Sequence, residues 1–225
     1  MKIKRTTAFR FKTFVVILLI VSCSGRINQE DREAASIGMR NREVKKVSQA
    51  DIYITGLLRG RQIAEAAQLL LANKLKETML NEDVQKAIRY CNIQAYPVID
   101  SLSKLYRASI KRVSLKLRNP YDAPDSLEDI LLNAYHYNVE YNMALQDNII
   151  SLDDNYLLYT MPILISDPVC LKCHGKKGSE VSDETLSLLK SLYPYDSATG
   201  YKMNDLRGMW SIRLPVREIV NSMDN

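Results

Sequence analysis

This chain has few potential metal ligands and no long apolar run. The run from Phe14 to Val21 spans eight residues, far below the roughly 20 that a membrane-spanning helix needs. Only two histidines and four cysteines occur among 225 residues, so the chain lacks the even, spread set of cysteines typical of a disulfide framework. It shows no internal repeat and no low-complexity tract. With 46% hydrophobic residues, it is long enough for one sizeable core.

The N-terminal residues have the layout of an export signal, with a basic stretch before the apolar run. The segment IVSC that follows resembles a bacterial lipobox and predicts that Cys23 is acylated; an ordinary cysteine beside a simple cleavage site is the alternative. We therefore predict a lipoprotein signal peptide at residues 1–22, a polar tether at 23–48 and a folded domain at 49–225. The protein is expected to be exported to the periplasm and lipid-anchored to a membrane, with Ser24 favouring the outer membrane.

Removal of this leader abolishes the excess of positive charge. The whole chain has 31 Lys and Arg against 26 Asp and Glu. The five basic residues before Cys23 leave with the signal, so the mature chain carries 26 of each. A strongly basic domain would indicate nucleic acid as a partner. No such indication remains, and we predict no binding of nucleic acid.

Periodic patterns predict two helices near the start of the domain. Apolar residues recur at helical spacing from about 50 to 80. A second helix is expected to begin after Asn81 as N-cap and to weaken near Tyr96, because Pro97 lacks an amide hydrogen.

The rest of the domain predicts strands with one inserted helix. Alternation over residues 109–119 indicates a strand, and the segments 155–166 and 206–216 indicate two more. Between them, Asp125 and Glu128 form a capping-box pattern at the start of a helix. Helices first, then strands with an inserted helix, predict an α+β fold.

The segment DPVCLKCHGKK places Cys170, Cys173 and His174 within five positions. In an exported chain, the pattern C-x-x-C-H is read first as the attachment site of haem c. Two thiols at this spacing can form thioethers to the two vinyl groups of a porphyrin. The adjoining histidine then supplies an axial nitrogen to the iron. We predict one covalent haem c at this site.

A zinc site and a redox-active dithiol are the two alternative uses of this motif. A zinc site needs four donors, usually as two pairs, and would have to recruit Cys91 or His136 from far along the chain. A thioredoxin-like dithiol would need C-x-x-C at the start of a helix in a βαβ unit, whereas a proline and a predicted strand precede this motif and Gly175 follows it.

Four stretches of the chain resemble the haem c-binding, PAS-like domain family, long known as a domain of unknown function. They are KAIRYCN at 86–92, RVSLKLRNPYDAPDSLE at 112–128, MPILISDPVCLKCHG at 161–175 and YPYDSATGYKMNDLRG at 193–208. The chain departs from the family pattern at Leu117, Asp122 and Asn204. Asn204 stands where glycine is usual, and asparagine tolerates the left-handed backbone region. The resemblance implies N-terminal helices followed by a PAS-like antiparallel sheet.

The resemblance also implies that Cys91 ligates the iron opposite His174. From periodicity alone, Cys91 lies on the apolar stripe of the second helix, where most cysteines merely pack. His136 and Met161 are the reserve ligands.

Three cationic residues, Arg112, Lys116 and Arg118, alternate along the predicted strand 109–119 and are candidates to bind the haem propionates. A solvated strand face is the equally ordinary alternative.

A thiolate–histidine pair favours ferric iron and a low reduction potential. We expect a monohaem protein that transfers electrons or senses redox state together with an envelope partner, and we expect no enzymatic activity. A haem enzyme such as a peroxidase is the alternative, but distal acid/base groups are scarce when only two histidines exist. A homodimer through the long first helix is left open.

Overall fold

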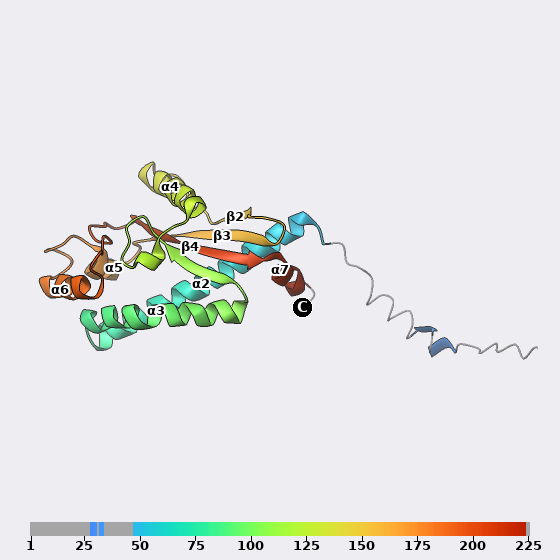
Figure 1. The fold of residues 1–225 in the computed structure, drawn as a ribbon, viewed down its shortest axis with the longest axis horizontal. Coiled ribbons are helices and arrows are strands. Elements are labelled where there is room, and N and C mark those ends of the chain that lie inside the picture. Colours follow the sequence, from blue (N-terminus) through green and yellow to red (C-terminus); the bar gives the residue numbers. More distant parts are fainter. Residues whose placement is uncertain (1–27, 31, 34–46, 224–225) are drawn as a thin grey trace, which may run out of the picture. The chain divides into compact units, whose positions relative to one another are not determined.

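The computed structural model describes residues 28–30, 32–33 and 47–223, and one compact unit spans Val47–Asn225 (Figure 1). The predicted signal peptide, the acylation site Cys23 and most of the predicted tether lie outside the described residues. Within the described part, no helix is both long enough and apolar enough to cross a membrane.

The compact unit begins with two long helices. Helix α2 spans Gln49–Asn81 and starts with a capping box, in which Ser48 and Asp51 exchange side-chain and backbone hydrogen bonds. Helix α3 spans Val84–Tyr106, and the carboxylate of Asp83 accepts a hydrogen bond from the amide of Lys86 at 2.7 Å. The prediction that Asn81 is the N-cap is wrong, because Asn81 is the last residue of α2 and Asp83 is the N-cap of α3.

Helix α3 continues through Pro97, contrary to the prediction that it weakens there. A proline removes one intrahelical hydrogen bond and crowds the preceding turn. The helix continues beyond this position because its apolar side chains Ile99, Leu102 and Tyr106 pack against the main core. Tertiary packing therefore outweighs the local preference at this position.

A four-stranded antiparallel sheet forms the centre of the unit, in the order β1-β4-β3-β2. The strands are β1 (Ser109–Val113), β2 (Asn148–Ser151), β3 (Tyr156–Leu164) and β4 (Leu206–Pro215). The α+β fold is thus confirmed, with the helix α4 (Ser126–Glu140) inserted between β1 and β2. As predicted, α4 begins with a capping box formed by Asp125 and Glu128.

Strand β1 is shorter than predicted, because it ends at Val113 rather than continuing to Asn119. At Ser114 the chain turns away: the Ser114 amide donates to Asp122 O at 3.1 Å, and its hydroxyl donates to Arg207 O at 2.7 Å. A short 3-10 helix, η1 (Pro120–Asp122), follows this turn.

Both faces of the sheet are covered, α2 lying on one side and α4 on the other (Figure 1). Trp210, Ile212 and Leu214 alternate along β4 and pack with Ile63 and Ala64 of α2 in the main core.

On the other face, Met209 of β4 packs with Val113 of β1 and with two residues of α4, Leu132 and Tyr135. Burial on both faces explains why β4 is almost continuously buried.

Three short helices complete the unit: α5 (Pro168–His174), α6 (Asp183–Leu192) and α7 (Val216–Ser222). Helices α5 and α6 lie together beside the first turns of α3, far from α7 (Figure 1). A small core containing Ile88, Val181, Leu189 and Tyr193 joins α3 to α6.

Close approach of α2 to the sheet depends on Gly60. A Cβ at Gly60 would overlap the ring of Tyr159 and lie 2.7 Å from the Cβ of that tyrosine. At Gly56, one turn earlier, a Cβ would meet only methyl groups at the ends of Ile149, Leu157 and Ile219, at 2.9 to 3.3 Å.

We therefore expect Gly60→Ala to lower the free energy of unfolding, because overpacking costs about 1–3 kcal/mol and exceeds the gain of roughly 1 kcal/mol in helix propensity. Gly56→Ala, in which flexible side chains can yield, should lose clearly less. Urea titrations of both variants measure this difference, and equal losses would contradict it.

Candidate functional site

A cavity of about 340 Å³ lies between α2, α3, the ends of β1 and β3, and α5. This volume falls within the range of small-molecule and cofactor pockets. The wall includes all three cysteines of the described chain and one histidine: Cys91, Cys170, Cys173 and His174. Three arginines also line it, Arg112, Arg118 and Arg207. The structure thus brings into one cavity residues that are up to 116 positions apart in the sequence.

The C-x-x-C-H segment forms helix α5, which the sequence did not predict. Asp167 caps the helix by accepting from the amide of Val169 at 2.9 Å, and Pro168 occupies the first turn. The helix ends at His174, and the amide of the C-cap residue Gly175 donates to Leu171 O at 2.9 Å. A Cβ at Gly175 would lie 2.7 Å from that same carbonyl oxygen and from the Cβ of Glu180, so this tight ending requires glycine.

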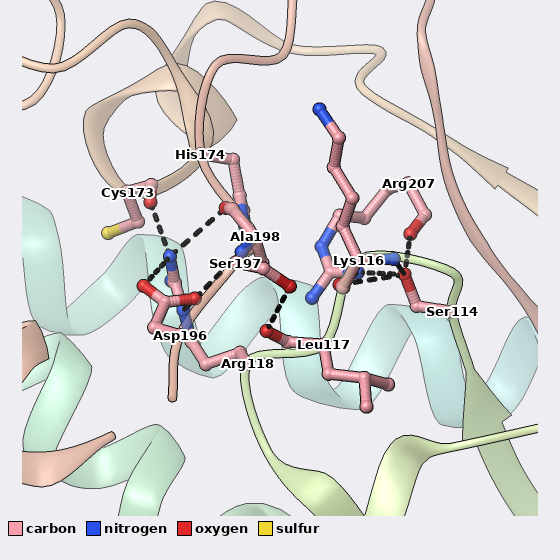
Figure 2. Close-up of polar contacts among 10 residues, drawn as sticks. All are labelled: Ser114, Lys116, Leu117, Arg118, Cys173, His174, Asp196, Ser197, Ala198 and Arg207. Carbon is pink, nitrogen blue, oxygen red and sulfur yellow. Dashed lines mark hydrogen bonds and ion pairs between the residues drawn. The ribbon is translucent and has the colours of Figure 1, made fainter. Parts of the chain in front are cut away.

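His174 is held with one ring nitrogen free. Its Nδ1 lies 2.7 Å from the carbonyl oxygen of Ala198 (Figure 2). A carbonyl only accepts, so Nδ1 carries the hydrogen and Nε2 keeps its lone pair. Burial and the positive charges of Arg207 and Arg118 hold the pKa of His174 well below its usual value. A neutral imidazole with its second nitrogen bonded to a backbone carbonyl is the usual state of a metal-ligating histidine.

The backbone around His174 is clamped to a neighbouring loop. The Tyr201 amide donates to His174 O at 2.9 Å, and the Gly200 amide donates to Gly175 O at 2.8 Å. Tyr201 also places its ring edge-on to the His174 ring, with centroids 6.0 Å apart. Asn204, just beyond this loop, adopts the left-handed conformation that asparagine tolerates, at φ 69°.

A buried ion pair supports the same clamp (Figure 2). The guanidinium of Arg118 contacts both carboxylate oxygens of Asp196 at 3.2 Å, and the two side chains are 13% and 8% exposed. The Arg118 Nη2 also donates to Cys173 O at 2.7 Å and to Ala198 O at 3.2 Å. Arg118 therefore joins α5 to the loop that holds His174.

Burial raises the pKa of two thiols in this cavity, those of Cys173 and Cys91. Cys173 reaches a pKa of about 11, despite an opposing effect of Arg118. The pKa of Cys91 is also raised by burial, with Arg112 and Arg118 acting in the opposite direction. Thiol exchange requires the thiolate, so this environment does not favour the dithiol alternative at neutral pH.

The candidate residues fall into two groups. Arg112 and Arg118 line the cavity with the motif residues, but Lys116 is exposed and its Nζ lies 4.8 Å from the Tyr201 ring centroid instead. The assumption that the three cations share one strand face is wrong, because β1 ends before Lys116 and Arg118.

The reserve ligands also lie away from this cavity. His136 is exposed on α4, and Met161 packs against the main core. The described residues contain no group of three or more His, Cys, Asp or Glu side chains arranged to hold a metal ion, so their geometry gives no support to zinc.

Arg207 is the cavity residue that sequence reasoning missed. It stands at the start of β4, in the stretch 193–208 that carried the family resemblance. Its Nη1 donates to Ser114 Oγ at 2.6 Å and to Lys116 O at 3.2 Å. The turn at Ser114, which was expected to be strand, supplies both hydrogen-bond acceptors of Arg207.

Comparisons with known proteins agree with the resemblance. The chain matches the family described as Tll0287-like over residues 35–215. The crystal structure of the cyanobacterial heme-protein Tll0287 shares 28% sequence identity with it, covering 54% of this chain and 69% of that chain with a TM-score of 0.45. No curated protein matches the chain.

Removal of Arg118 tests the buried clamp. We expect Arg118→Ala to cost about 3–5 kcal/mol of unfolding free energy, because it leaves the buried Asp196 carboxylate without its counter-charge. Arg213→Ala is the matched control: it removes an exposed pair with Asp125, at 2.6 Å, and should cost at most about 1 kcal/mol. Chemical denaturation of both variants measures the difference, and similar losses would contradict the structural role of Arg118.

Proposed function

Since the chain belongs to the Tll0287-like family, we propose that it is a c-type haem protein that carries one haem on Cys170 and Cys173, with His174 as an axial ligand. The solved protein that bears the family's name is described as a haem protein. The observation that carries the proposal is the Nδ1 contact of His174 with Ala198 O at 2.7 Å. It leaves Nε2 available in a cavity lined by both motif thiols.

The residues present fit this group. The cavity combines two thiols three positions apart, a neutral imidazole and arginine side chains, which match the vinyl groups, the iron and the carboxylates of a haem. A bound haem would supply a one-electron iron couple. The protein's part is to orient the ligand nitrogen, to exclude water with the apolar wall of α2 and α3, and to supply positive charge.

Cys91 is our candidate for the second axial ligand. It lines the same cavity as His174 from a separate helix, α3. Neither His136 nor Met161 lines that cavity. A thiolate ligand favours the ferric state, so a low reduction potential follows.

Electron transfer or redox sensing suits this site better than catalysis. A peroxidase needs an open iron position and distal acid/base groups. In the described chain, the one histidine besides His174 is exposed on α4, outside the cavity. We propose that the haem domain has a PAS-like sheet, and that acylated Cys23 anchors it in the cell envelope, where it exchanges electrons or signals with a partner protein.

The first test is covalent attachment. The exported protein, matured in a host that makes c-type cytochromes, should gain the mass of one haem and give the pyridine haemochrome spectrum of a thioether-linked haem. Cys170→Ala/Cys173→Ala should lose all covalent haem, because both thioether sulfurs are gone. Cys91→Ser, which removes a cysteine of the same cavity, should retain it; a colourless wild-type protein without added mass would overturn the proposal.

The second test concerns Cys91 itself. Cys91→Ser should change the ferric absorption spectrum and raise the reduction potential, because the thiolate no longer stabilises ferric iron. Tyr90→Phe alters the neighbouring cavity-lining residue without removing a sulfur and should leave the spectrum unchanged. An unaltered spectrum in Cys91→Ser would remove Cys91 from the iron.

A further inference from the structure

The cavity wall carries more positive than negative charge. Its charged lining residues are four cations, Lys76, Arg112, Arg118 and Arg207, and two acids, Asp122 and Asp167. Lys76 pairs with Asp167 at 2.7 Å. The other acid, Asp122, accepts a hydrogen bond from the Tyr96 hydroxyl at 2.8 Å.

Arg118 is already committed to the fold. It has its own carboxylate, Asp196, and two backbone carbonyl oxygens as acceptors. Its side chain is only 13% exposed. Arg118 is therefore a poor candidate to bind an anionic group of a ligand, although Arg112 and Arg118 were both predicted to do so.

Arg112 has no hydrogen-bond or ion-pair partner among the described residues. Its guanidinium carbon lies 5.9 Å from the centre of the Trp210 ring, which supports one face of the planar group. Its donors therefore remain available. The described chain contains no buried side-chain nitrogen or oxygen without a partner, so these donors are accessible and not enclosed by protein.

Arg207 is held by hydrogen bonds from one nitrogen and by the ring of Tyr201, whose centre lies 5.7 Å from its guanidinium carbon. Its Nη1 contacts Ser114 Oγ and Lys116 O, whereas no hydrogen bond or ion pair among the described residues uses Nε or Nη2. Burial and the nearby charges of Arg112 and Arg118 lower the pKa of Arg207. Arg112, Arg118 and Arg207 line the same cavity, so their positive charges repel one another, and an anion between Arg112 and Arg207 would relieve that repulsion.

We propose that Arg112 and Arg207 bind the two carboxylates of the ligand in this cavity, which are the propionates of the haem if the proposed function holds. Arginine presents a planar fork of donors that matches a carboxylate, and it stays charged when buried. The side chain of Lys116 has no part in this site, and Arg118 acts on it only by holding α5. The paired charges also raise the reduction potential relative to a site with bare propionates.

The experiment uses haem-loaded Arg112→Gln and Arg207→Gln, with Lys116→Gln as a control that removes one nearby positive charge outside the cavity. Potentiometric titration is carried out from pH 6 to pH 8. Each arginine variant should have a lower midpoint potential than the wild type, because an uncompensated carboxylate favours ferric iron.

The pH profile separates pairing from a merely structural role. Without its arginine, a propionate has a raised pKa and takes up a proton when the iron is reduced. The potential of each arginine variant should therefore rise as the pH falls from 8 to 6. The wild type and Lys116→Gln should be flatter, and Arg112→Lys and Arg207→Lys should recover part of the lost potential.

Each outcome decides the assignment. This site would be overturned if haem-loaded Arg112→Gln and Arg207→Gln had the same potentials and pH profiles as Lys116→Gln. The proposed function would remain intact. A shift in Lys116→Gln as large as in the arginine variants would also overturn this site. A wild-type protein that carries no haem would overturn the proposed function and, with it, the propionate assignment.

Discussion

The buried ion pair between Arg118 and Asp196 is the interaction on which the candidate site depends. Its guanidinium bonds to the carbonyl oxygens of both Cys173 and Ala198, and Ala198 in turn accepts the Nδ1 hydrogen of His174. One side chain therefore fixes both α5 and the orientation of the imidazole. Charge in such a buried position is stabilised only while both partners are present, so the geometry of His174 and the stability of this region are linked.

The sheet and its two covering layers supply the frame for that clamp. Gly60 lets α2 approach Tyr159 closely, and Trp210 packs in the same core. Trp210 also supports Arg112, and its indole Nε1 donates to Gln68 of α2 at 3.0 Å. The residues that stabilise the fold thus also position a charged group at the cavity wall.

Regular periodicity made most of the fold predictable, whereas long-range contacts decided the remainder. The apolar stripe of α2, the capping box of α4 and strands β3 and β4 follow from local pattern. The helix through Pro97 did not, because packing of its later turns overrides the local cost. Cys170, Cys173 and His174 were recognisable from spacing alone. Arg207 and the separate role of Arg118 were not, because both depend on the turn at Ser114, which joins segments 93 positions apart.

The wall of the cavity comes from segments scattered between residues 68 and 208, and this has a consequence for biogenesis. Such a wall exists only after the most distant segments have met, which is late in folding. Cys173 is then half-buried in that wall and is less accessible. If the motif receives its cofactor, we expect the thioether bonds to form on an open chain, so that the domain closes around a group already attached.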